Sequence, residues 1–354
     1  MHICFIALEY FGWGKYGGIG KATRDLASGL ARKKTKVSVV VPLGVGQGRC
    51  EYLDGVDVYG FPLSEYPFIG GLLRSIDADI YHSQDATLGT WLAKKRCSDS
   101  VHLLTCQNPK TRGDWEKVNQ FYQKRRLIYN RFIDPQVRKC VKELDHVYCQ
   151  ARCTIGKAKK LFDLEYEPGF LPNPVEVPYT MPVKSRSPIV LFLGRFDGEK
   201  NPVAFMDLAK SFPEVHFIAA GASHDPEYDE ALRSNYSDVE NLSLPGFVDG
   251  AEKNSILDAA WVLVNTSVSE CLPVSFLEAA AHGCSILSPH DPDGFASRFG
   301  LHTSHEGLAE GLSLLLEDDH WRDRGREGYG FVKENYEANK VIDRHLEEYS
   351  RWLS

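Results

Sequence analysis

Short apolar runs alternate with segments of helical periodicity along nearly the whole chain, and this alternation restricts the fold more than any other feature. Apolar runs of three to five residues are typical of buried strands and are too short for helices. Strands of this kind separated by helices predict parallel sheets that are covered by helices on both faces. Together with an opening strand over His2–Leu8, the expected strands are Val37–Val41, Ile80–His82, His102–Cys106, Ile189–Leu193, Val215–Ala219, Val262–Asn265 and Ser285–Ser288.

A proline-rich stretch over residues 168–188 divides this pattern in two. Its six prolines are compatible with neither a helix nor a central strand. A chain of 354 residues also suits about two domains. We therefore expect an α/β protein with two Rossmann-like parallel-sheet domains facing a central cleft. The expected parts are an N-terminal domain over 1–172, a hinge over 173–188, a C-terminal domain over 189–335 and a last helix over 336–354 that crosses back to the N-terminal domain.

Composition and cysteine usage indicate a globular cytoplasmic protein. Hydrophobic residues make up 43% of the chain and charged residues 25%. No apolar run approaches the roughly 18 residues that a membrane span needs, and the N-terminal segment lacks the basic region of a signal peptide. The nine cysteines are scattered and include no Cys-x-x-Cys pair, which favours buried thiols such as Cys4, Cys106 and Cys149 over a zinc site.

The formal net charge of −7 conceals a basic segment over residues 110–160. Within it, residues 115–133 interleave aromatic and basic side chains. A segment of this kind suits an anionic acceptor or the surface of an anionic membrane. It equally suits a helix that buries its aromatic rings in its own domain and leaves its charges in water. We expect peripheral contact with an anionic membrane here, and no nucleic-acid partner.

Two acids, Glu270 and Glu278, lie eight residues apart around the start of an apolar, alanine-rich helix that is expected to begin at Val274. An acid on an apolar helix face needs a partner, and an ionised carboxylate accepts hydrogen bonds well from sugar or ribose hydroxyls. A solvated surface pair is the alternative. The first turn of the same helix, at Val274 and Ser275, presents N–H groups to an anion.

Two cations follow the expected strand Ile189–Leu193 directly. Gly194 and Arg195 come first, and Lys200 lies five residues further on. A guanidinium and an ammonium at one strand end, with glycine allowing close approach, can hold a diphosphate without a metal. The alternative is a basic loop in solvent.

These features together resemble the retaining glycosyltransferases of the GT-B fold, family 4. The resemblance covers nearly the whole chain, in the expected order. It implies that the protein transfers a hexose-type sugar from a UDP-, GDP- or ADP-sugar to a hydroxyl of a glycan, lipid-linked or small phosphorylated acceptor, with no metal or other cofactor. The matching motifs are Gly17-Gly18-Ile19-Gly20, Leu171-Pro172-Asn173-Pro174, Gly194-Arg195-x4-Lys200 and Glu270-x7-Glu278.

The resemblance also implies a division of labour among these residues. In such enzymes the departing diphosphate takes the proton of the acceptor, so that no protein nucleophile is required and catalysis is mainly electrostatic. The implied roles are diphosphate binding by Arg195 and Lys200 with the N–H groups of Val274 and Ser275, ribose binding by Glu278, sugar binding by Glu270, and closure of the first domain on donor and acceptor through Gly17 and Gly18.

The chain departs from the family pattern at the end of the strand that begins at Ile80. The family usually shows His-x-His followed by an acid or an aromatic residue, and here the sequence is His82-Ser83-Gln84-Asp85. A catalytic role is therefore open between His82, Gln84 and Asp85, and a core position is the alternative for His82. In addition, Cys271 stands where the family commonly has glycine.

Three other interpretations are compatible with parts of the sequence. Gly12-x-Gly14-x-x-Gly17 matches the dinucleotide fingerprint of an NAD-dependent oxidoreductase, although Val37–Val41 ends without the acid that would bind the adenosine ribose. The pairs Asp77-x-Asp79 and Asp291-x-Asp293 look like metal motifs, although Asp79 precedes its strand and should point away from the ligand edge. The departures at the histidine motif and at Cys271 also leave open a non-catalytic GT-B-like binding protein.

Overall fold

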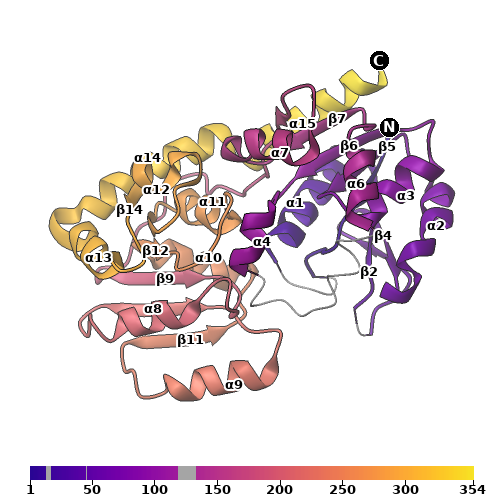
Figure 1. Ribbon diagram of the computed structural model, residues 1–354. Coiled ribbons are helices and arrows are strands. Elements are labelled where there is room, and N and C mark those ends of the chain that lie inside the picture. The colour runs from indigo at the N-terminus through magenta and orange to yellow at the C-terminus, as the bar shows by residue number, and fades with distance from the viewer. Residues whose placement is uncertain (13–16, 45, 119–132) are drawn as a thin grey trace. The chain divides into compact units, whose positions relative to one another are not determined.

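The computed structural model describes residues 1–12, 17–44, 46–118 and 133–354. The chain forms two compact units, each with its own sheet (Figure 1). The first unit comprises Met1–Gly113, Gln123–Pro174 and Ala338–Ser354, and the second is built mainly from Val175–Glu337.

The expected hinge belongs largely to the second unit, because its backbone and side chains are bound there. The Val175 N–H donates to the carbonyl of Tyr336 at 3.0 Å, and the Tyr329 hydroxyl donates to the carbonyl of Pro178 at 2.9 Å. The structural boundary after Pro174 therefore lies two residues beyond the expected end of the first domain at 172.

The first unit contains one sheet with the strand order β3-β4-β2-β1-β5-β6-β7-β8. Its described strands run parallel, apart from β3, which pairs antiparallel with β4. The expectation of parallel pairing is corrected at this edge. Asp54 and Gly55, with φ of 53° and 86°, form the hairpin turn, and an Asp-Gly pair is a known signal for such a turn. The strands are β1 (His2–Ile6), β2 (Lys36–Pro42), β3 (Cys50–Leu53), β4 (Val56–Phe61), β5 (Ile80–Gln84), β6 (Val101–Cys106), β7 (His146–Cys149) and β8 (Gly169–Phe170).

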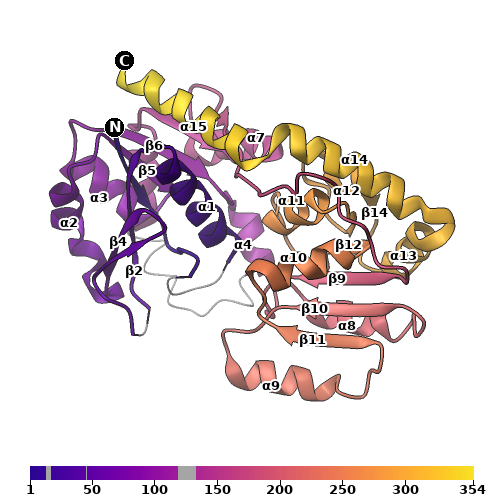
Figure 2. The same ribbon diagram turned by 180° about the vertical axis from the view of Figure 1, so that it is seen from behind.

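The C-terminal helix α15 packs beside α1 in the first unit (Figure 2). Gly29 of α1 permits this contact, because a Cβ at that position would collide with Ile342. Tyr148 adds polar contacts, donating to Glu348 at 2.7 Å and accepting from Trp352 at 2.8 Å. The helices are α1 (Gly18–Arg32), α2 (Gly70–Ile76), α3 (Leu88–Arg96), α6 (Asp134–Val141), α7 (Ile155–Phe162) and α15 (Ala338–Leu353), with 3₁₀ turns at Leu63–Phe68 and Arg152–Thr154. Helix α4 (Arg112–Val118) has its first two residues in the first unit, and the second unit begins at its Asp114.

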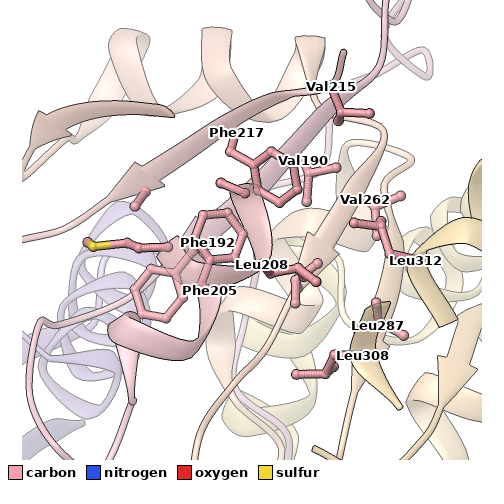
Figure 3. Packing of buried hydrophobic residues seen from close by; sticks show 14 of the residues in the cluster. Val190, Phe192, Phe205, Leu208, Val215, Phe217, Val262, Leu287, Leu308 and Leu312 are labelled. Carbon is pink, nitrogen blue, oxygen red and sulfur yellow. The ribbon is translucent and has the colours of Figure 1, made fainter. Parts of the chain in front are cut away.

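The second unit contains a six-stranded sheet with the order β11-β10-β9-β12-β13-β14, in which all pairs are parallel among the residues described. In its core the ring of Phe205 lies 5.6 Å from that of Phe192 and 5.4 Å from that of Phe217 (Figure 3). The strands are β9 (Ile189–Leu193), β10 (His216–Ala220), β11 (Leu242–Gly246), β12 (Val262–Val264), β13 (Ser285–Ser288) and β14 (Gly300–His302).

Helices on both faces cover this second sheet. Buried Trp321 of α14 stacks on Trp261, which precedes β12, with 4.4 Å between the ring centroids. The helices are α8 (Pro202–Ala209), α9 (Pro226–Asn235), α10 (Gly250–Ala259), α11 (Val274–Ala281), α12 (Phe295–Phe299), α13 (Leu308–Leu316) and α14 (His320–Asn335), with 3₁₀ turns at Pro292–Gly294 and Glu317–Asp319.

Two further expectations concern membranes and cysteines. None of the helices in the described part of the chain combines the length and apolar character that a membrane span needs.

Cys4, Cys106 and Cys149 are buried as expected, whereas Cys50 and Cys153 are exposed.

Candidate functional site

The loop after β9 brings the two expected cations to the carboxyl end of a central strand. Asp197 organises this loop with both of its carboxylate oxygens. Its Oδ1 accepts from the backbone N–H of Lys200 at 2.9 Å, and its Oδ2 pairs with Nε of Arg195, also at 2.9 Å. Both cationic side chains remain partly exposed. The expected guanidinium and ammonium therefore both lie at this strand end, in contact with solvent.

A glycine that the sequence did not single out sets the course of this loop. A Cβ at Gly221, directly after β10, would collide with the carbonyl oxygen of Gly194. At Gly194 itself a Cβ would meet only ordinary contacts with Phe192, at 3.5 Å. The close approach between the backbones of residues 194 and 221 therefore requires a glycine at Gly221, whereas packing does not require one at Gly194.

Glu270 is almost completely buried, with 6% of its side chain exposed, and three donors converge on one of its oxygens. Oε1 accepts from Nζ of Lys200 at 2.5 Å, from Oγ of Ser267 at 2.7 Å and from Nδ2 of Asn265 at 3.2 Å. Among the described residues, Oε2 accepts no hydrogen bond. The carboxylate is thus fixed by one oxygen, and the other can accept from a ligand hydroxyl.

A hollow opens beside this cluster at the carboxyl edge of the second sheet. Lys200, Asn265, Ser267, Glu270 and Ser275 supply its polar lining. Helix α11 begins next to it, and no side chain of the described residues caps its first turn. The N–H groups of that turn are consequently directed to the same edge, where they favour an anion.

Glu278, the second acid, is paired with a lysine that the sequence did not single out. Its Oε1 accepts from Nζ of Lys253 on α10 at 2.8 Å, and only 13% and 12% of the two side chains are exposed. Directly after the last residue of α11, Nδ1 of His282 lies 2.6 Å from Oδ1 of Asp258, also on α10. Burial lowers the pKa of His282. Lys253 and Glu278 are 25 positions apart and lie on two different helices, so their spacing in the sequence does not predict that they pair.

In the first unit, His82 is a fully buried core residue with both ring nitrogens engaged. Nδ1 lies 2.8 Å from the hydroxyl of Tyr349, and Nε2 lies 2.8 Å from that of Thr105. Burial lowers the pKa of His82 well below its ordinary value. The ring therefore connects β5 and β6 to α15 and has no nitrogen left for a substrate, which is the core alternative that the sequence had left open.

Gln84 and Asp85 lie at the carboxyl end of β5 in a cluster of amides. Nε2 of Gln107 donates to Oε1 of Gln84 at 2.9 Å and to Oδ1 of Asn173 at 3.0 Å. Asp85 has a φ of 106°, which is unusual for a non-glycine residue, and its Oδ1 accepts from the backbone of Gln107 at 3.2 Å. Burial raises the pKa of Asp85 to about 6. The motif residue Asn173 thus belongs to the same polar edge.

Gly17 and Gly18 stand at the start of α1, and Gly17 accommodates a side chain of its own unit. A Cβ at Gly17 would collide with Oε2 of Glu9. A Cβ at Gly20 would lie 3.0 Å from Cβ of the same glutamate. Gly14 of the dinucleotide fingerprint lies outside the described residues, as do residues 119–132 of the aromatic and basic stretch.

The candidate metal motifs take part in other contacts. Oδ2 of Asp79 accepts from the backbone N–H of His2 at 2.6 Å, and Oδ1 of Asp291 accepts from that of Ser297 at 3.0 Å. In the part of the chain that the structure describes, no three His, Cys, Asp or Glu side chains come together as metal ligands.

Comparison with known proteins agrees with this geometry. Residues 181–327 match the family model of glycosyl transferases group 1, and residues 2–130 match that of the starch synthase catalytic domain. No curated protein sequence gives a significant match. The chain is therefore a glycosyltransferase of the GT-B fold, and the oxidoreductase alternative has no support.

Solved structures share this fold over almost the full length. A sucrose-phosphate synthase from Thermosynechococcus elongatus has a TM-score of 0.78 at 15% identity, with 100% of this chain and 99% of that chain covered. The Anabaena protein HepE in complex with UDP-glucose has a TM-score of 0.73 at 13% identity, with coverage of 99% and 100%. The catalytic domain of starch synthase IV from Arabidopsis thaliana, bound to ADP and acarbose, has a TM-score of 0.68 at 13% identity, with 99% of both chains covered.

Proposed function

We propose that the protein is a retaining glycosyltransferase of family 4 that transfers a hexose-type sugar from a nucleoside diphosphate sugar to an acceptor hydroxyl, without a metal. The observation that carries this proposal is the arrangement around Glu270. Three protein donors hold Oε1, Lys200 is one of them, and Oε2 remains for a ligand at the end of β12. A carboxylate held in this way suits the hydroxyls of a sugar whose diphosphate lies beside the same lysine.

In the proposed mechanism the protein binds and orients the donor while the charge shifts onto the diphosphate. Arg195, Lys200 and the first-turn N–H groups of Val274 and Ser275 stabilise that charge. The bond from the anomeric carbon to the diphosphate oxygen breaks, and its electron pair stays on that oxygen. The acceptor oxygen bonds to the same face of the anomeric carbon, and its proton passes to the departing diphosphate. No protein nucleophile takes part.

The proposal specifies the nucleotide base, the sugar and the acceptor only as chemical classes. Similar folds hold UDP-glucose, UDP or ADP, which supports a UDP-, GDP- or ADP-sugar as donor. A glycan, a lipid-linked sugar or a small phosphorylated molecule is the proposed acceptor. The polar edge with Gln84 and Asp85 supports hydroxyl binding in the first unit. We propose a cytoplasmic location, with peripheral contact to an anionic membrane through residues 110–160.

Two alanine variants test the donor site. Arg195→Ala and Glu278→Ala should each reduce transfer by about 10²-fold or more, because a preorganised charge is lost, while the fold is retained. Arg322→Ala is the matched control, since Arg322 pairs with Asp319 on the surface of the same unit. Wild-type turnover in either site variant would refute the site assignment.

A ligand panel tests the enzyme against the non-catalytic alternative, which Gln84 and Cys271 suggested. Thermal unfolding is measured with UDP, GDP, ADP and their glucose conjugates, and binding should raise the melting temperature with one base. Product NMR then reports the anomeric configuration, and inversion would refute the retaining mechanism. Binding without any transfer to a panel of glycan, lipid-linked and phosphorylated acceptors would favour the non-catalytic protein.

A further inference from the structure

The ion pair between Lys253 and Glu278, like the pair between Lys200 and Glu270, is largely shielded from water. Only 12% of the Lys253 side chain and 13% of the Glu278 side chain are exposed, and Nζ lies 2.8 Å from Oε1. By contrast, Lys210 and Asp207 form a 2.7 Å pair in which each side chain is 52% exposed. Exposed pairs contribute little, whereas removing one partner of a shielded pair leaves an uncompensated charge.

The helices that carry this pair are joined a second time, one turn further along. Asp258 of α10 and His282, which directly follows α11, lie 2.6 Å apart. The carboxylate of Asp249 is a further charged group near the ammonium, at 3.7 Å from Nζ of Lys253. Two links between α10 and α11 fix the orientation of Glu278 relative to its partner, so the carboxylate is held in one direction rather than sweeping through solvent.

The same arrangement is found at both acids of the site. At Glu270 and at Glu278, a lysine ammonium occupies Oε1, and Oε2 accepts no hydrogen bond from the residues described. Two bare carboxylates would repel a diphosphate anion that binds nearby, because like charges in a poorly hydrated site interact strongly. A lysine on each acid neutralises that repulsion and leaves one oxygen for a hydroxyl.

We propose that Lys253 is a positioning residue for ribose recognition. It holds Glu278 through Oε1, so that Oε2 faces the vicinal hydroxyls of the nucleotide, and it neutralises the acid next to the diphosphate. This inference rests on the proposed function, in which Glu278 binds the ribose. Lys253 acts through Glu278 and does not touch the reacting atoms.

The experiment compares ribose with deoxyribose. Dissociation constants are measured by calorimetry for UDP, ADP and GDP and for their 2′-deoxy counterparts, on the wild type and on Lys253→Met. We expect Lys253→Met to weaken binding of the preferred ribonucleotide by about tenfold and binding of its deoxy counterpart by less than twofold. The reason is that the interaction lost is the hydrogen bond between Glu278 and the ribose hydroxyl, which the deoxy nucleotide lacks. Lys253→Arg should restore most of the discrimination. Lys210→Met, which removes the exposed pair, should leave it unchanged.

The outcomes separate this inference from the proposed function. If Glu278→Ala abolishes the preference for ribose while Lys253→Met retains it, the role of Lys253 is refuted and that of Glu278 stands. If Glu278→Ala retains the preference, or if no nucleotide binds the wild type, the proposed ribose site is itself refuted, and the inference with it. Equal losses for both nucleotides in Lys253→Met also refute it. Lys253→Gln and urea unfolding of each variant identify any loss of fold.

Discussion

Buried histidines should make the first unit lose stability in mild acid, and His345 allows the size of the loss to be worked out. Burial, with a smaller contribution from Arg344, lowers the pKa of His345 to about 4 from its ordinary value of 6.5. Its Nδ1 lies 2.9 Å from the carbonyl of Val341 and donates to it. Below pH 6.5 the unfolded chain takes up a proton that the folded unit refuses, so acid favours unfolding.

The loss from this one residue amounts to about 2 kcal/mol between pH 7 and pH 5 and about 3 kcal/mol by pH 4, where it levels off. His82 adds to the loss in the same direction, because its pKa is also lowered by burial. Since domains commonly have total stabilities of roughly 5–15 kcal/mol, the effect should be large enough to measure.

The assay is hydrogen exchange at increasing urea concentration, read on peptides from β5 and α15 at pH 7, 6 and 5. His345→Asn replaces the titrating ring with an amide that does not ionise. Its free energy of unfolding should be lower than that of the wild type at pH 7, and the difference should shrink by about 2 kcal/mol at pH 5. His320→Asn, at an exposed position, is the control. A wild-type-minus-variant difference that stays constant from pH 7 to pH 5 would show that the reasoning is wrong.

Two further substitutions test the construction of the proposed donor site. Ser267→Ala removes one of three donors from Oε1 of Glu270 and should lower kcat/KM by about tenfold with little change in stability, which steady-state kinetics and urea unfolding check. Gly221→Ala forces its Cβ against the carbonyl of Gly194 and should cost about 2 kcal/mol of stability and weaken nucleotide binding. Gly330→Ala, where the added methyl meets open space, is its control, and equal behaviour of the two glycine variants would contradict the packing argument.

The regular architecture was predictable because it follows from local patterns. The strands Ile189–Leu193 and Ser285–Ser288 have the expected bounds, and α11 begins at the expected Val274. Apolar runs and their spacing carry this information residue by residue. The hairpin of β3 and β4 was also within reach, since Asp54 and Gly55 form its turn. It was missed because β3 contains alternately exposed residues rather than an apolar run.

By itself, the sequence determined the class of fold and predicted the acids and cations of the candidate site. It indicated Arg195, Lys200 and Glu270, because each of their motifs follows the carboxyl end of an apolar strand closely in the sequence. Only the tertiary structure decided which residues pair with Glu278 and His82, namely Lys253 and Tyr349. These pairs join residues 25 and 267 positions apart. A contact of that kind exists only after helices and strands have packed, so no local pattern of residues could encode it.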